Sequence, residues 1–246
     1  MSGGSVPPTT AVALTYQLLL RQLVTRGRVA ALLTVGIAVA VVAWAVGASD
    51  DVTDPLEAAI GVIAGLGFTV VVPVVSLVFA TASLGDARED GTLVYLWLRP
   101  IDRWPVVVGA WLAALTVSLP LTVGPLALAT VLSGQSGEIL GATMVATVVG
   151  VVAYTALFVL FGLAVRNAIV WGLGYVLIWE GVISAFGTSA ARLALSGYTR
   201  SIVTRMTDVE LELGDQSLVA GIVVPLVVAV VALVLATRRL QSMDVD

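Results

Sequence analysis

The chain has 246 residues, of which 59% are hydrophobic and only 11% charged, and its formal net charge is −4. So few polar groups cannot shield the apolar ones from water, which excludes one or two ordinary soluble domains and indicates a polytopic membrane protein. The chain has no His, no Cys and no Lys, so all 12 basic residues are Arg. These absences exclude an imidazole base, a thiolate nucleophile, the usual zinc and haem sites and a Walker A phosphate loop. We therefore expect no catalytic residue, metal or cofactor in this chain, and the lack of a basic stripe disfavours nucleic-acid binding.

Six long apolar runs predict six membrane-spanning helices and an all-α fold. A run of about 20 residues is needed because a spanning segment must satisfy its backbone groups inside lipid. The runs are Val29–Ala48 and, roughly, Glu57–Ala82, Pro105–Leu132, Ile139–Val165, Ala168–Ala190 and Ser217–Thr237. We expect one transmembrane domain over 11–237, between a flexible N-terminal tail, 1–10, and a C-terminal tail, 238–246.

The arginines predict the orientation, since positive charge near span ends is retained in the cytoplasm. Most of them fall on the side that both termini share: Arg21, Arg26, Arg28, Arg88, Arg99, Arg103, Arg166, Arg238 and Arg239. The acidic residues show the opposite bias. We therefore expect a multi-pass protein of the cell membrane with both termini in the cytoplasm.

A short amphipathic stretch follows the N-terminal tail. Its apolar residues form one stripe at helical spacing: Val12, Tyr16, Leu19, Leu20 and Leu23. Such a stripe predicts a helix that lies in the headgroup plane. The alternative is a helix packed on the rest of the protein.

The most charge-dense stretch, 83–105, connects the second and third predicted spans on the arginine-rich side. We expect a short cytoplasmic helix, with acidic residues toward its start and Arg99 at its end before Pro100. Within it, Leu93, Leu96 and Trp97 recur at helical spacing and form an apolar surface flanked by charges.

This stretch resembles the signature of type-2 ABC exporter permeases, in the runs Arg88-Glu89-Asp90-Gly91-Thr92-Leu93, Tyr95-Leu96 and Arg99-Pro100-Ile101-Asp102-Arg103. In that family the corresponding loop is a coupling helix that docks in a groove of the ATP-binding subunit. The resemblance assigns docking to Arg88, Glu89, Asp90, Gly91, Thr92, Leu93, Leu96, Trp97, Arg99, Pro100 and Arg103. The chain departs from the family at Val94, where Glu is common, and at Gly109-Ala110, which replaces Gly-Lys.

The resemblance implies a non-catalytic permease subunit of an ATP-driven exporter. Its partners would be an ATP-binding subunit, which would hold ATP and Mg²⁺, and a second permease copy or a paralogue, all in a lipid bilayer. The alternative is a membrane anchor or assembly factor that recruits a cytosolic partner without transport. The residues do not identify a substrate.

Glu180 is the only ionisable residue deep within a predicted span. An ionised carboxylate at that depth costs roughly 2.5–3.5 kcal/mol, so it must face the bundle interior and find a partner. We favour a packing role, with a hydrogen bond to Ser184 as one example, over a role in a polar substrate path.

Other features of the spans are less specific. Four prolines fall inside predicted spans and are expected to bend them: Pro73, Pro120, Pro125 and Pro225. Gly61 and Gly65 give the second span a small-residue face. In the external loop 191–216, Tyr198, Ile202 and Met206 recur at helical spacing and predict a short helix at the outer interface.

Overall fold

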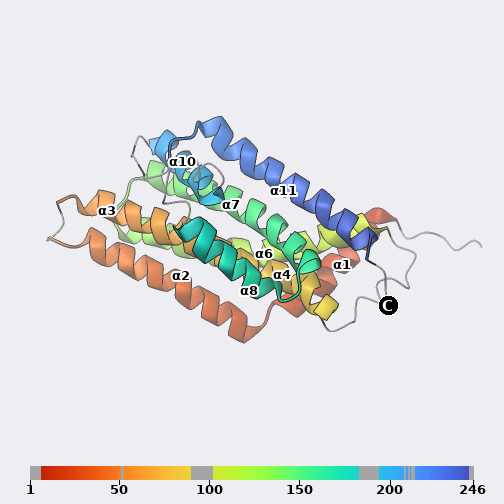
Figure 1. Cartoon of the computed structure of the whole chain (residues 1–246). Helices are drawn as coiled ribbons and strands as arrows, with labels where there is room; N and C mark the ends of the chain where they lie inside the picture. Colours follow the sequence, from red (N-terminus) through yellow and green to blue (C-terminus); the bar gives the residue numbers. More distant parts are fainter. Residues whose placement is uncertain are drawn as a thin grey trace, which may run out of the picture.

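The computed structural model describes residues 7–50, 53–89, 102–182, 194–207, 209, 211 and 214–243 (Figure 1). Of these residues 88% are helical and none is in a strand, which confirms the all-α fold. The elements are α1 (Pro8–Leu23), α2 (Arg26–Gly47), α3 (Pro55–Val62), η1 (Ile63–Val71), α4 (Val72–Glu89), α6 (Arg103–Leu132), α7 (Gly137–Ala164), α8 (Ala168–Gly174), η2 (Tyr175–Val182), α10 (Leu195–Thr207) and α11 (Leu218–Gln241).

Five helices in the described part are long and apolar enough to cross a membrane: Arg26–Gly47, Pro55–Glu89, Arg103–Leu132, Gly137–Ala164 and Leu218–Gln241. They match five of the six predicted spans and make the chain a multi-pass membrane protein. The predicted fifth span is helical over Ala168–Val182, and its remainder, 183–190, lies outside the described residues. This 15-residue helix has a length of about 22 Å, less than the roughly 30 Å of a bilayer core, so a sixth crossing stays a prediction.

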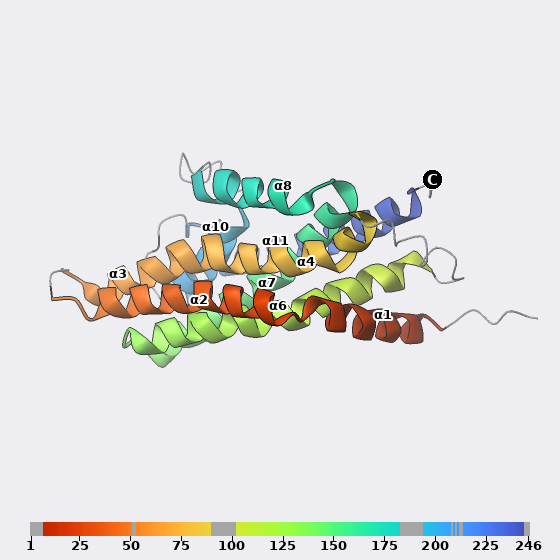
Figure 2. The ribbon, with the colours of Figure 1, turned by 90° about the horizontal axis from the view of Figure 1, so that it is seen from below.

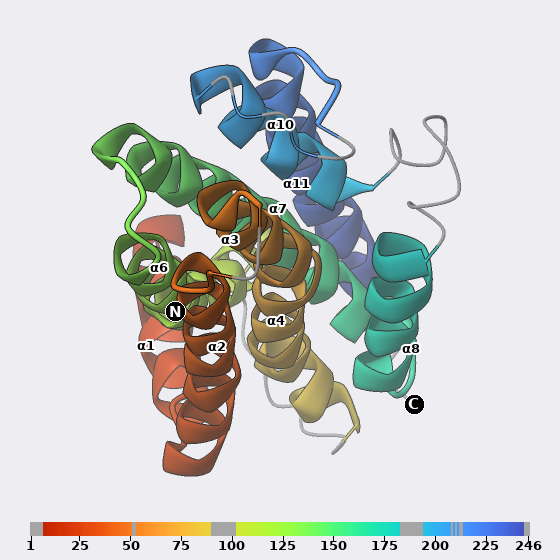
Figure 3. The ribbon, with the colours of Figure 1, turned by 90° about the vertical axis from the view of Figure 1, so that its left-hand side faces the viewer.

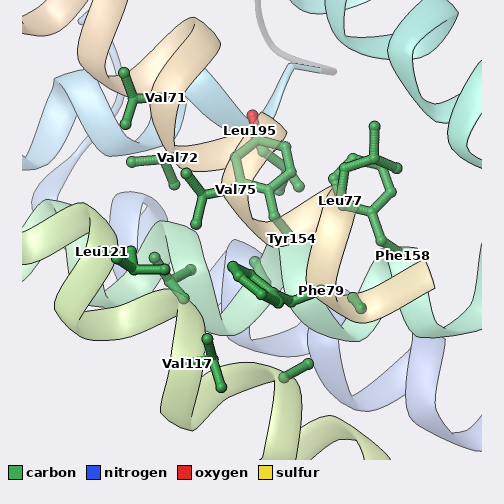
Figure 4. Packing of buried hydrophobic residues seen from close by; sticks show 14 of the residues in the cluster. Val71, Val72, Val75, Leu77, Phe79, Val117, Leu121, Tyr154, Phe158 and Leu195 are labelled. Atoms are coloured by element: carbon green, nitrogen blue, oxygen red, sulfur yellow. The ribbon is translucent and has the colours of Figure 1, made fainter. Parts of the chain in front are cut away.

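Helix α7 is the centre of the bundle (Figure 3). Helices α4, α6, α10 and α11 pack around it, while α2 and α8 lie toward opposite edges. Figure 4 shows part of the core, to which α4 contributes Phe79, α6 contributes Val117 and α7 contributes Tyr154 and Phe158. Figure 2 shows α8 and η2 on the face of the bundle opposite α1 and α2.

Two glycines bring α4 and α7 into backbone contact. A Cβ on Gly162 would lie 3.0 Å from the carbonyl oxygen of Thr81 and 3.4 Å from the amide nitrogen of Gly85. A Cβ on Gly85 would lie 3.3 Å from the Cα of Gly162. Because lipid tails supply no hydrophobic drive between helices, such close approach is a main source of helix association in membranes.

The second span is one 35-residue helix, Pro55–Glu89, whose middle part η1 has the wider turn of a π-helix. Pro73 comes two residues after η1. Since proline has no N–H and its ring meets the carbonyl four residues earlier, a local widening lets the helix continue through it. In α6, Pro125 is buried, and a Cβ on Gly36 of α2 would lie 2.8 Å from its ring.

The described arginines that were predicted to share a side are at or near helix termini toward one end of the bundle: α4 and α11 end there, α6 begins there, and the junction of α1 and α2 lies in the same half (Figure 1). At the same end, Arg28 of α2 forms an ion pair of 3.3 Å with Asp86 of α4. Asp54 and Glu57 lie at the opposite end, at the start of α3. The structure therefore places these arginines and these two acidic residues toward opposite ends of the bundle. Which end faces the cytoplasm stays a prediction.

The N-terminal helix packs on protein along part of its predicted apolar stripe, and its position relative to the headgroup plane stays a prediction. Leu19 and Leu23, from the predicted stripe, are buried, and α1 lies against α6. Gly109 of α6 permits the contact, because a Cβ there would lie 2.9 Å from the Cβ of Thr15. The helix begins at Pro8, so the predicted flexible tail 1–10 was too long, and α11 continues past residue 237 to Gln241.

We predict that Gly162→Leu forces α4 and α7 apart and destabilises the fold by about 1–3 kcal/mol, the usual cost of overpacking. Thermal unfolding of the purified protein in detergent measures the loss. Gly124→Leu is the matched control, because a Cβ on this glycine of α6 meets nothing within 4 Å. Equal melting temperatures for the two variants would contradict the assigned crossing.

Candidate functional site

Glu180 is the buried acid around which the candidate site is built. It lies near the end of η2 and is 1% exposed. The Tyr175 hydroxyl donates a hydrogen bond of 2.8 Å to its Oε1. The backbone N–H of Leu195 donates to Oε1 and that of Ser196 to Oε2, each at 3.1 Å. The carboxylate thus joins η2 to the first turn of α10.

These hydrogen bonds matter because α10 begins inside the bundle, where its first N–H groups are buried. The first four N–H groups of a helix have no partner within the helix, and water is not available to them at membrane depth. A carboxylate that accepts two of these N–H groups satisfies them and complements the helix dipole. Glu180 therefore acts as an N-cap supplied by another helix.

This geometry supports the packing role that we expected for Glu180, with different partners. Ser184, the example from the sequence, lies outside the described residues. The actual donors are separated from Glu180 by 15 and 16 positions, so local spacing did not reveal them. The one local signal was Tyr175, five positions earlier, since a buried tyrosine hydroxyl needs an acceptor.

A second polar contact holds α10 against the π-helical turn of the second span. The Arg200 guanidinium donates from Nη2 to the Thr69 hydroxyl of η1 at 2.7 Å. Tyr154 of α7 is within electrostatic range of both Glu180 and Arg200. Figure 4 shows the Tyr154 hydroxyl directed toward Leu195 at the start of α10. Polar groups from three elements, η1, α7 and η2, thus converge on this one short helix.

Helix α10 itself confirms the helix predicted in the external loop, although it is more deeply packed than an interfacial helix. Ile202 is buried, whereas Met206 is 42% exposed. Two glycines make room for it: a Cβ on Gly150 of α7 would lie 3.1 Å from Thr199, and a Cβ on Gly221 of α11 would lie 3.0 Å from Ile202.

The predicted coupling segment starts differently from our expectation. Residues 83–89 are the last turns of α4, so the acidic residues close a spanning helix and do not open a separate one. An acidic residue at a helix C-terminus opposes the dipole. Here Asp86 pairs with Arg28, and Glu89 Oε1 accepts a 2.9 Å hydrogen bond from the backbone N–H of Asn167.

The structure places only part of the predicted docking set. Arg88 and Glu89 are in the last turn of α4, and Arg103 is the first residue of α6. The other predicted residues lie outside the described part of the chain: Asp90, Gly91, Thr92, Leu93, Leu96, Trp97, Arg99 and Pro100. The two helix ends that this segment connects are both at the arginine-rich end of the bundle.

The contacts of Glu89 and Glu180 hold the two ends of one helical segment. Asn167, which has the left-handed backbone φ of 56°, precedes α8 and is bound by Glu89 of α4. Helix α8 continues directly into η2, which carries Glu180 near its end. The segment Ala168–Val182 therefore connects the end of α4 to the start of α10 through two carboxylates.

Comparison with protein-family models and with curated proteins finds no match to the chain. The fold defines an all-α multi-pass membrane protein, and in its described part the carboxylates of Asp86, Glu89 and Glu180 lie at or near helix ends.

We predict that Glu180→Leu destabilises the protein by about 1–3 kcal/mol for each donor left without an acceptor. Faster hydrogen exchange at the amides of Leu195 and Ser196 is the specific readout. Glu138→Leu, an exposed acidic residue in the first turn of α7, serves as the control with the same loss of charge. Unchanged exchange in α10 of the Glu180 variant would contradict the capping role.

Proposed function

We propose that the chain is the transmembrane permease subunit of an ATP-driven exporter of the type-2 ABC class, which couples ATP hydrolysis by a separate subunit to substrate movement. The observation that carries the proposal is the signature from Arg88 to Arg103, whose two flanking helix ends, the end of α4 and the start of α6, lie at the arginine-rich end of the bundle. We infer that this end faces the cytoplasm of a cell membrane.

The five described spans and the apolar α8–η2 helix support the proposal. Because the centre of this bundle is filled by α7 and its neighbours, the substrate pathway would lie at the interface with a second copy or a paralogue. The chain itself would be non-catalytic. ATP and Mg²⁺ would be bound by the partner, as the resemblance implies. Closure of the ATP-binding subunits would then shift the permease between two conformations.

The contacts within the bundle supply a route for that shift. A force on the segment after Glu89 acts first on the end of α4. From there the Glu89–Asn167 hydrogen bond transmits it to α8 and η2, and the Glu180 carboxylate transmits it to α10. We propose that α10 moves in response to ATP binding at the opposite end of the molecule.

We predict that Leu93→Asp abolishes co-purification of an ATP-binding subunit with the full-length chain, because an apolar anchor residue carries most of the affinity of a docking surface. Membrane insertion should be unchanged. Gly91→Pro is expected to have the same effect. Val94→Glu is the control, because Val94 lies off the apolar stripe and the resembled family often has Glu there.

Normal co-purification of the Leu93 variant would contradict docking by this segment. Binding of a cytosolic protein without a Walker A motif, together with no ATPase stimulation, would instead favour the anchor or assembly factor.

We predict that Glu89→Ala separates docking from transmission. It removes the acceptor for the Asn167 N–H and one charged residue of the predicted docking set, but it keeps Leu93, Leu96 and Trp97, the apolar residues that would carry most of the docking affinity. The ATP-binding subunit should still co-purify, while ATP should no longer alter hydrogen exchange in α10. Glu89→Gln keeps an acceptor oxygen and should preserve the response. An equal ATP response in the Ala variant and the unmodified protein would exclude this route.

A further inference from the structure

A cavity of about 450 Å³ opens at the arginine-rich end of the bundle, between the last turn of α4 and the turn that joins α7 to α8. Its lining residues are Arg88, Glu89, Arg166 and Asn167. Two of the four carry guanidinium groups, so the lining is net positive.

Neither guanidinium is neutralised by a residue that the structure describes. The ion pair found in that part of the chain joins Arg28 to Asp86, and the Glu89 carboxylate accepts from the backbone of Asn167. Nη1 of Arg88 is buried without a hydrogen-bond acceptor among the described residues. A buried N–H of a charged group without an acceptor is costly, and such a group points to an anion that the protein binds.

A second cavity, of about 320 Å³, adjoins the first, because both are lined by Glu89 and Asn167. It lies between α4 and α8 and is lined by Thr81, Gly85, Asp86, Glu89, Asn167, Ala168, Ile169 and Val170. Asp86 is paired with Arg28, and the apolar part of the lining is formed by Ala168, Ile169 and Val170, of which the last two are 40% and 68% exposed. A polar pocket with two arginines thus lies beside a groove with one apolar wall. Both are at the ends of α4 and α7, and headgroups meet hydrocarbon near the ends of membrane-spanning helices.

We infer that the two cavities bind an anionic phospholipid, with its phosphate between Arg88 and Arg166 and one acyl chain along Ile169 and Val170. Arginine suits this ligand because its planar guanidinium donates two parallel hydrogen bonds to phosphate oxygens. The bound lipid would hold the end of α4 against the turn before α8. The inference concerns this chain alone and does not depend on the proposed export function.

The test measures phospholipid binding to the purified full-length chain by native mass spectrometry, with phosphatidylglycerol and phosphatidylcholine as probes. We expect at least tenfold preference for phosphatidylglycerol, and loss of that preference in Arg88→Gln/Arg166→Gln. Arg238→Gln/Arg239→Gln is the matched control, since it removes the same charge from exposed positions at the same end of the bundle. An unchanged preference in the first double variant, or an equal loss in the control, would overturn the assignment.

Further measurements distinguish a bound lipid from free phosphate and show that a loss of binding is not caused by misfolding. Ile169→Ser/Val170→Ser should weaken lipid binding while the arginines are intact, and inorganic phosphate should not displace the lipid at millimolar concentration. Displacement by phosphate together with no effect of the groove variant would overturn the lipid assignment. Glu89→Gln removes the one negative charge that lines the first cavity and should strengthen binding about two- to fivefold, a gain that misfolding would not produce.

Discussion

Backbone hydrogen bonding inside lipid is the constraint on which the rest of this structure depends. Each long span satisfies its own N–H groups, but α10 begins within the bundle and cannot. The Glu180 carboxylate accepts two of these N–H groups and the Tyr175 hydroxyl, so one buried acid satisfies three donors. Without that acid, the first two N–H groups of α10 would be buried without their acceptor.

Close helix packing is the second requirement, and glycine provides it at specific places. The crossing of α4 and α7 at Gly85 and Gly162 fixes the centre of the bundle, and Gly150 and Gly221 admit α10 beside it. By contrast, a Cβ on Gly61 or Gly65 would meet nothing within 4 Å. No helix of the described chain therefore packs closely against the GxxxG pair of the second span.

Features that depend on local sequence patterns could be predicted from the sequence. Hydropathy gave the long spans, and the distribution of arginine gave the two ends of the bundle. Tertiary contacts determined the rest: the donors to Glu180 are 15 and 16 positions away, and Asn167 is 78 positions from Glu89. The helix expected to start near Asp86 proved to be the end of α4, because Arg28 and Asn167 stabilise acidic residues where local preference disfavours them.

Three carboxylates of the described chain each join two elements of the bundle. Asp86 joins α2 to α4, Glu89 joins α4 to the turn before α8, and Glu180 joins η2 to α10. The Glu180 contacts with α10 are buried and are therefore worth more than their counterparts on a soluble surface. The Arg28–Asp86 and Glu89–Asn167 contacts are at least partly exposed at the end of the bundle and contribute less. The three contacts form a continuous series from the arginine-rich end to the opposite half of the bundle. In the proposed function, this series is the route by which a displacement of α4 would move α8 and then α10, and it requires each of these hydrogen bonds to remain intact.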